Sequence, residues 1–382
     1  MMMPEWVRCF ALIALTTGQM PSRDASLSAA LAELDKGRVL ESIQQFKQIV
    51  RVDPSNGPAY FYLSTIYTEL KEYAFAERYL RRAMELSPNQ GQHYYQLGVI
   101  RFRQEQWRPA LGLFKQALEI GFARSEARIW RSIGDVQLEL FDRDAALQAY
   151  TEALRIQPGD SRTRLALGRF YLERGEPGRA TEHLRAALKA DPSLHAAHPL
   201  LARAYQQSGD LQSAVTVLKE ALDTDPADQE SRYELGRAFL ATGRADEGRA
   251  ELDKYQSIRQ QVASAESNYQ NALSSLAEGK LSEAEASLRE AVRLAPKYGP
   301  ALHSLGTLLL DRGSPEKALG FLEGAVEVNP LNAATWYSLG TAYFKSGKLT
   351  EALEAAKRAI ALNEDNPQYP QLLREIEGRV RR

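Results

Sequence analysis

The segment LARAYQQSGDLQSAVTVLKEALDTDP, Leu201 to Pro226, contains two short helical patterns separated by one glycine. Its apolar residues recur every three or four positions on both sides of Gly209, which is the spacing of a helix packed on one face. Gly209 suits the left-handed residue that ends a helix, and Pro226 ends the second pattern because proline is excluded from helix interiors. The segment therefore predicts a helix, a tight turn, a second helix and a stop.

Glycines and prolines that end helices recur along the chain at a constant spacing. Prolines that follow an apolar helix recur at one or two lengths of a common period, and they are Pro54, Pro88, Pro158, Pro192, Pro226, Pro296 and Pro330. Turn glycines recur with the same period, and they are Gly175, Gly209, Gly243, Gly279, Gly313 and Gly347. A period of about 34 residues indicates an array of helical hairpins that stack on one another.

The repeated unit resembles the tetratricopeptide repeat (TPR). One unit carries Trp336, Leu339, Gly340, Tyr343 and Ala352 at the signature positions of that family. The resemblance extends over residues 23–366 as about ten units. It implies an all-α fold, a right-handed superhelical α-solenoid of helix-turn-helix repeats with a C-terminal capping helix.

The repeats are expected to form two stacks, repeats 1–7 over residues 23–262 and repeats 8–10 over residues 263–366. No glycine or proline occurs between Gly248 and Gly279, which predicts an overlong helix followed by a poorly punctuated junction near Val262. Residues 367–382 are expected to form the capping helix. The first unit has no aromatic residue in its first helix, as expected of an end of the array.

Residues 1–22 resemble a secretory signal peptide or leader. An apolar stretch, CFALIAL at 9–15, follows Arg8 and is trailed by small and polar residues, although Glu5 offsets the positive charge. The stretch is too short to span a bilayer, which takes about 20 apolar residues. We expect cleavage and export to the periplasm or cell envelope. An uncleaved anchor, a disordered leader and a cytoplasmic location are the alternatives.

Composition excludes several classes of partner and chemistry. The 48 Lys and Arg residues balance 49 Asp and Glu residues, which argues against binding to nucleic acid or anionic membranes by bulk charge. A single cysteine, Cys9, excludes an intramolecular disulfide. No phosphate loop, dinucleotide fingerprint, nucleophile elbow or HExxH motif occurs. We therefore expect no enzymatic activity, no catalytic residue, no cofactor and no stable membrane span.

His195 and His198 form one H-x-x-H pair, at the spacing of two metal ligands on a helix. His198, however, falls at the position that holds Trp130 and Trp336 in other units, and no third ligand is evident nearby. We expect no metal site, and a metal-dependent enzyme is the weakest hypothesis.

The family resemblance implies that the first helices of the repeats line a concave groove. Its ninth position holds Arg169, Arg203 and Arg237 in three consecutive units. Arg169 is expected to pair with Glu173 one helical turn later, whereas the other two have no partner at that spacing. A row of guanidinium groups suits an acidic segment or a C-terminal carboxylate, because each can form two parallel hydrogen bonds to a carboxylate. The alternative role is solubility and ion pairs between units.

Four further residues complete the candidate groove. They are Arg103, Arg131, Tyr95 and Tyr233. The aromatic members offer flat contact area for a partner but serve helix packing equally well. We therefore expect a non-enzymatic scaffold that binds a protein or peptide in the groove. The alternative is a regulatory or targeting subunit of an enzyme or secretion complex, such as a glycosyltransferase, with the chemistry on another chain.

Overall fold

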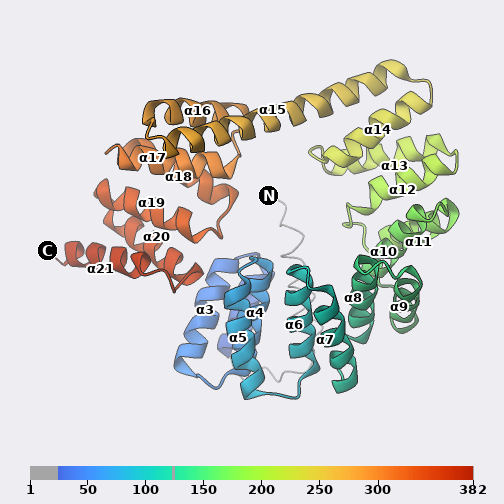
Figure 1. Cartoon of the computed structure of the whole chain (residues 1–382), viewed down its shortest axis with the longest axis horizontal. Helices are drawn as coiled ribbons and strands as arrows, with labels where there is room; N and C mark the ends of the chain where they lie inside the picture. Colours follow the sequence, from blue (N-terminus) through green and yellow to red (C-terminus); the bar gives the residue numbers. More distant parts are fainter. Residues whose placement is uncertain (1–24, 123–124, 382) are drawn as a thin grey trace. The chain divides into compact units, whose positions relative to one another are not determined.

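The chain is built from helices alone within the residues that the computed structural model describes, 25–122 and 125–381. These residues form 20 α-helices and no β-strand. Consecutive helices pack against each other in pairs (Figure 1). The all-α fold and the helix-turn-helix repeats predicted from the spacing of glycine and proline are thus confirmed. In each repeat we call the first helix A and the second helix B. The expected leader, residues 1–22, lies outside the described residues.

Residues 55–257 form one compact unit. Its helices, in A and B pairs, are α4 (Gly57–Glu69), α5 (Tyr73–Leu86), α6 (Gly91–Arg103), α7 (Trp107–Ile120), α8 (Glu126–Glu139), α9 (Arg143–Ile156), α10 (Ser161–Glu173), α11 (Pro177–Ala190), α12 (Ala197–Gln207), α13 (Leu211–Thr224) and α14 (Gln229–Ala241). From α6 to α14, each A helix also packs against the B helix before it, as α12 does on α11. The apolar faces are therefore buried between successive repeats.

The second compact unit combines both ends of the chain, residues 25–54 and 258–381. Its helices are α2 (Ala25–Asp35), α3 (Val39–Val52), α16 (Leu281–Leu294), α17 (Gly299–Asp311), α18 (Pro315–Val328), α19 (Ala333–Lys345), α20 (Leu349–Leu362) and α21 (Gln368–Val380). The sequence predicts the first hairpin to be an end of the array, yet α3 contacts α20. The expected domain boundaries stay a prediction.

Helix α15 (Ala245–Ala277) is the overlong helix predicted from the absence of glycine and proline between Gly248 and Gly279. Its first part is the B helix of repeat 7 and its last part is the A helix of repeat 8. The helix runs through Val262 without a break, so the junction expected there is absent. Without a glycine or proline in this stretch, nothing in the local sequence ends the helix.

The capping helix is confirmed as α21, which packs on α20 and α19. Leu372 and Ile376 are buried and Leu373 is half-buried, whereas Val380 is exposed. The helix therefore covers the apolar surface of the last repeat with its central turns only.

The turn between helices A and B needs a left-handed residue. Gly209 has φ +82°, and the other turn glycines have similar values. Repeats 2, 3 and 4 place Lys71, Glu105 and Phe141 in this conformation, at φ of 61° to 62°. These side chains carry a backbone cost of about 1 kcal/mol or more that glycine avoids. The glycine spacing is consequently regular only from Gly175 onward.

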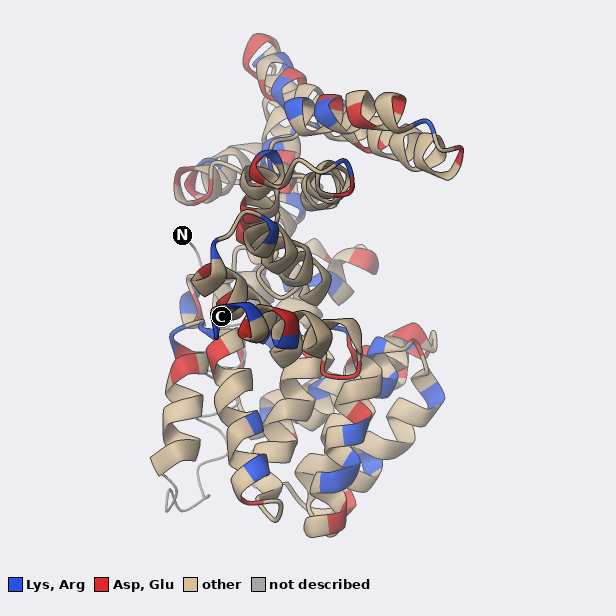
Figure 2. Cartoon of the chain, turned by 90° about the vertical axis from the view of Figure 1, so that its left-hand side faces the viewer, with Lys and Arg blue, Asp and Glu red and all other residues tan. Residues whose placement is uncertain are grey.

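Charged residues are spread over the helices. Basic and acidic residues are interspersed on the side of the molecule that Figure 2 shows, in keeping with the formal net charge of −1. No helix in the described part of the chain combines the length and the apolar character needed to cross a membrane.

Candidate functional site

The A helices of residues 55–257 carry the predicted arginine ladder. Arg169 lies on α10, Arg203 on α12 and Arg237 on α14, and all three side chains are exposed. Neighbouring A helices are in contact, α10 with α12 and α12 with α14. The repeat period therefore gives one exposed guanidinium at the same register position of three adjacent helices.

The three arginines differ in their partners. Arg203 has no ion pair or hydrogen bond through its side chain among the residues that the structure describes. Arg237 lies 3.5 Å from Glu234 and 5.8 Å from the ring centre of Tyr233. Arg237 thus has no carboxylate four residues after it, as the spacing indicates, but it has one three residues before it.

Arg169 does not form the expected ion pair with Glu173 within the described part of the chain. Its charge instead acts on the preceding repeat, where it opposes the rise in the pKa of Asp135 and of Tyr150. Arg169 therefore lies close enough to Asp135 for its charge to act on that carboxyl, which the local sequence spacing could not indicate.

Arg131 is a structural cation rather than a free one. Its Nη1 atom lies 3.0 Å from Asp160 Oδ2, and the two side chains are only 16% and 14% exposed. Asp160 also accepts a hydrogen bond from the backbone N–H of Thr163, which caps the start of α10. Burial acts to raise the pKa of Asp160, but the Arg131 guanidinium and the hydrogen bonds from Thr163 together outweigh it, so the pKa is lowered. This ion pair links α8 to the beginning of α10.

A second acid, the half-buried Asp135, acts on the charge of Arg131. Asp135 Oδ1 accepts a hydrogen bond of 2.7 Å from the hydroxyl of Tyr150, a fully buried residue. Burial raises the pKa of Asp135, although Arg131 and Arg169 oppose the rise. Burial and the nearby carboxyl also raise the pKa of Tyr150, so this hydroxyl stays a donor.

Two more guanidinium groups surround this pair. Arg128 and Arg162 occupy the second position of repeats 4 and 5 and are half-buried. Burial lowers the pKa of Arg128, and the charges of Arg131 and Arg162 lower it further.

The remaining predicted residues lie at the two ends of this face. The Tyr95 ring packs 5.4 Å from Phe114, and its hydroxyl lies 3.3 Å from Ser132 Oγ, so it belongs largely to the packing between repeats. Arg103 is exposed and lies 3.5 Å from Glu69 of the preceding repeat. Tyr233 is 38% exposed and thus accessible beside Arg237.

Sequence reasoning missed two interactions, the ion pair of Arg131 with Asp160 and the hydrogen bond of Tyr150 to Asp135. The partners in each pair lie on different elements, so no helical spacing connects them. One available signal is the order of Asp160 and Thr163, an acid three residues before a buried threonine at a helix start. It marks a helix cap but does not reveal the ion pair with the preceding repeat.

The histidine pair shows no metal-binding geometry. His198 Nδ1 lies 3.2 Å from the backbone oxygen of His195, so it faces its own turn. Among the described residues, no group of three or more His, Cys, Asp or Glu side chains is arranged to hold a metal ion.

The comparison with protein families agrees with the repeat pattern. One tetratricopeptide-repeat model matches residues 137–204, 205–276 and 275–330, and a second matches residues 27–91, 95–161 and 303–367. Each model covers about half of the chain or more. The chain belongs to the tetratricopeptide-repeat family, whose members generally act in protein interactions rather than catalysis.

Solved structures of other repeat proteins are similar at low sequence identity. YrrB, described as a TPR protein with an unusual peptide-binding site, is 20% identical with a TM-score of 0.36, and the match covers 49% of this chain and 95% of YrrB. PilF from Pseudomonas aeruginosa is 17% identical with a TM-score of 0.48, covering 55% and 95% of the two chains. PilW, described as a type IV pilus biogenesis factor, is 16% identical with a TM-score of 0.49, covering 56% and 98%. No match to a curated protein was found.

Proposed function

We propose that the chain is a non-enzymatic interaction scaffold whose A-helix face, formed by α6, α8, α10, α12 and α14, binds an acidic segment of a partner protein. The observation that carries the proposal is the series Arg169, Arg203 and Arg237, one exposed guanidinium in each of three adjacent A helices. Each guanidinium can bind a carboxylate through two hydrogen bonds.

The spacing of the ladder defines the partner more closely. Packed helices lie about 10 Å apart, and an extended peptide advances about 3.3 Å per residue. Carboxylates that reach successive arginines are therefore about three residues apart in an extended segment. The expected ligand carries Asp or Glu at every third position, or an equivalent spacing that ends in a C-terminal carboxylate.

A charge-reversal variant tests this function. The double substitution Arg203→Glu and Arg237→Glu should weaken binding of a labelled peptide with glutamate at every third position by about 10-fold or more, because two attractive contacts become repulsive. Wild-type binding should weaken as salt is added. The measurement is fluorescence anisotropy, with a peptide of equal composition but clustered glutamates for comparison.

Arg108→Glu with Arg143→Glu is the matched control, since both residues are exposed on B helices and the change in net charge is the same. Equal weakening by the two double variants would mean that net charge alone attracts the peptide. Unchanged binding in both would show that the arginines only solvate the surface.

We also propose that the protein acts in the bacterial cell envelope. The support is the apolar stretch after Arg8, within residues 1–22. The mass of the mature protein tests the proposal. A new N-terminus near Gln19 or Met20 is expected, and an intact Met1 in the purified protein would oppose it.

A further inference from the structure

The A helices of neighbouring repeats touch at a constant set of positions. The Phe61 ring of α4 lies 5.6 Å from the His93 ring of α6, measured between ring centres. The Tyr95 hydroxyl of α6 lies 3.3 Å from Ser132 Oγ of α8. Counted along the repeat as for the arginine ladder, these are fifth positions that meet the third and sixth positions of the next repeat. An A helix thus covers the fifth position of the repeat before it.

The twelfth position is covered in the same way. Gln96 Nε2, at the sixth position of repeat 3, donates a hydrogen bond of 2.8 Å to Thr68 Oγ1, at the twelfth position of repeat 2. Thr68 is buried, and so are the leucines at the twelfth position of repeats 5 and 9, Leu172 and Leu310. The fifth and twelfth positions therefore belong to the surface on which the next A helix packs.

Repeat 7 departs from this arrangement. Its fifth and twelfth positions, Tyr233 and Leu240 on α14, are 38% and 43% exposed. Among the described A helices from α4 to α14, only α14 carries large hydrophobic side chains that are exposed. The two residues lie two helical turns apart and so share one face of α14. Within the described part of the chain, no A helix covers this face as α8 covers Tyr95.

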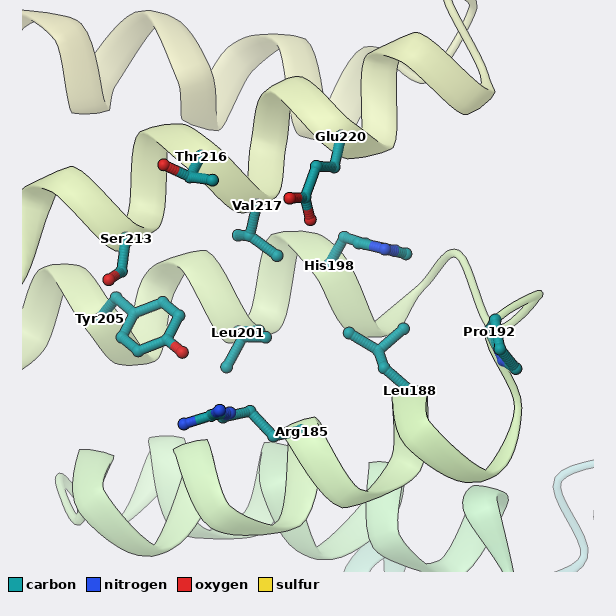
Figure 3. A pocket seen from close by; sticks show the side chains of 10 residues that line it. All are labelled: Arg185, Leu188, Pro192, His198, Leu201, Tyr205, Ser213, Thr216, Val217 and Glu220. Carbon is teal, nitrogen blue, oxygen red and sulfur yellow. The ribbon is translucent and has the colours of Figure 1, made fainter.

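A buried apolar residue at the seventh position accompanies the docking of an A helix. In repeat 6 this residue is Leu201 of α12, which Figure 3 shows extending toward α11, where it lines a pocket of 420 Å³ together with Leu188. Its counterparts in repeats 5, 7, 9 and 10 are buried as well, and they are Leu167, Leu235, Leu305 and Leu339. The leucine therefore packs an A helix against the B helix of the repeat before it.

Repeat 8 lacks this leucine. Its A helix is the last part of α15, and its sixth and seventh positions are Gln270 and Asn271, both of which are exposed. A side-chain amide is costly to bury unless it is hydrogen-bonded, so it does not replace a leucine at a helix contact. The last part of α15 is therefore unsuited to the uncovered face of α14, in keeping with the unbroken course of α15 through Val262.

We propose that the face of α14 formed by Tyr233 and Leu240 binds an amphipathic α-helix of a partner protein, which docks as the next A helix of the array. The A helices of this chain define its chemistry, two small residues three positions apart and a leucine directly after the second. Residues 163–167, 301–305 and 335–339 carry this pattern as TRLAL, ALHSL and TWYSL. The small residues make room for Tyr233 and Leu240, and the leucine packs on the first part of α15, as Leu201 does on α11.

A second copy of the chain does not present such a helix through its own α14. The residues that meet the preceding repeat, at the third and sixth positions of α14, are Ser231 and Glu234. Both are buried, so they are not available to another copy. Two copies would instead bring Tyr233 and Leu240 of each chain together, without the small residues that such side chains meet elsewhere in the array.

The docked helix leaves the arginine ladder accessible. Arg203 on α12 is exposed although α14 packs on α12, so a helix that packs on α14 in the same way leaves Arg237 exposed. The proposal does not rest on binding of an acidic segment to the ladder. The two surfaces are tested with different peptides and different variants.

A labelled peptide that copies α10, residues 161–173, tests the proposal by fluorescence anisotropy with the full-length chain. Its sequence, SRTRLALGRFYLE, contains the pattern and carries three arginines and one glutamate, so the arginine ladder does not attract it. The control peptide has equal charge and carries Ala166→Gln and Leu167→Asn, the residues found at 270 and 271. The copy should bind about 10-fold or more tightly than the control, because the control buries an amide in place of a leucine.

Variants of the full-length chain locate the binding surface. Leu240→Gln should weaken binding of the α10 copy by about 5-fold or more, because apolar contact is lost. Tyr233→Ala provides a second variant on the same face, and circular dichroism checks that each variant is folded. Ile156→Gln, at an exposed residue of the B helix α9, is the matched control and should leave binding unchanged.

Three outcomes would overturn the proposal. The first is equal binding of the two peptides. The second is unchanged binding of the α10 copy in both Leu240→Gln and Tyr233→Ala. The third is a dimer of the full-length chain that Leu240→Gln dissociates, since the face would then be an interface between copies.

Discussion

At the residue scale, the closest approach between helices lies at the small positions of the A helices. A Cβ atom at Gly168 would lie 2.6 Å from Leu184 Cδ2, and Leu184 is fully buried. Gly168→Ala gains about 1 kcal/mol of helix propensity but forces a buried leucine to move, which costs about 1 to 3 kcal/mol. We expect net destabilisation of about 1 kcal/mol, measured as a lower midpoint of urea unfolding.

Two variants separate packing from helix propensity at this site. Gly178→Ala on α11, where a Cβ meets nothing within 4 Å, should leave stability unchanged or raise it by about 0.5 kcal/mol. In the background of Leu184→Ala, the substitution Gly168→Ala should no longer destabilise. A destabilising Gly168→Ala in both backgrounds would exclude the contact with Leu184 as the cause.

Burial of His93 predicts a pH dependence of stability. The side chain is 2% exposed beside Phe61, and burial lowers its pKa below the usual 6.5. As pH falls below 6.5, His93 binds a proton in the unfolded chain but stays neutral in the folded chain. The free energy of unfolding is therefore highest above pH 6.5 and decreases as pH falls toward the lowered pKa of His93. The melting temperature should therefore fall between about pH 7.5 and 5.5.

His93→Leu should show a smaller fall in melting temperature over this window. Part of the dependence should remain, because burial also lowers the pKa of His183 and His303. An equal fall in the variant and the wild type would mean that His93 has the same pKa in the folded and the unfolded chain.

Sequence reasoning succeeds at this scale where the signal is periodic. The exposure of Arg169, Arg203 and Arg237 follows from a single register position. Ion pairs between repeats, such as Arg131 with Asp160, depend on the rotamers of two long side chains on separate elements. The repeat period determines the backbone of each hairpin but carries no information on these rotamers.

At the element scale, turn glycines mark the ends of the A helices from Gly175 onward, and the absence of glycine and proline predicts α15. Every residue from 256 to 263 in the middle of this helix is exposed. Packing therefore supports its two ends, near Leu252 and Ala272, rather than the middle. The middle section relies on intrinsic helix propensity and on continuity with the packed ends.

Gln261→Pro should break α15 locally. Proline removes a helical hydrogen bond and clashes with the preceding turn, at a cost of about 3 kcal/mol. We expect faster amide exchange at residues 256–263, measured by mass spectrometry, with protection retained around Leu252 and Ala272. Gln261→Ala should keep the wild-type pattern. A loss of protection throughout both flanking repeats would show that the exposed section stabilises them.

At the scale of the whole molecule, one compact unit is assembled from both ends of the chain. Helix α3 packs against α20, and Phe46 and Lys47 of α3 are buried. The repeat pattern could not predict this contact, because it describes only neighbouring hairpins. The extra burial explains why a terminal hairpin with a weak repeat signature is well packed.

The ion pair between Lys47 and Glu364 should hold the first hairpin in this unit. Lys47 Nζ lies 3.1 Å from Glu364 Oε2, and the lysine side chain is 6% exposed. Glu364→Gln leaves a buried ammonium group without its carboxylate, so we expect a loss of about 1 to 3 kcal/mol in urea unfolding. Lys47→Met removes the charge and keeps the stem, and should reverse most of that loss in the double variant.

Hydrogen exchange distinguishes docking of the hairpin from a local effect on α20. In Glu364→Gln, amides of α2, α3 and α20 should lose protection together, whereas residues 55–257 should keep theirs. Glu327→Gln, an exposed acid on α18, should change neither region. If α20 alone lost protection, the ion pair would stabilise its own helix without holding the hairpin. A concerted loss would establish that the two ends of the chain fold as one cooperative body, because their shared surface is buried only when both are in place.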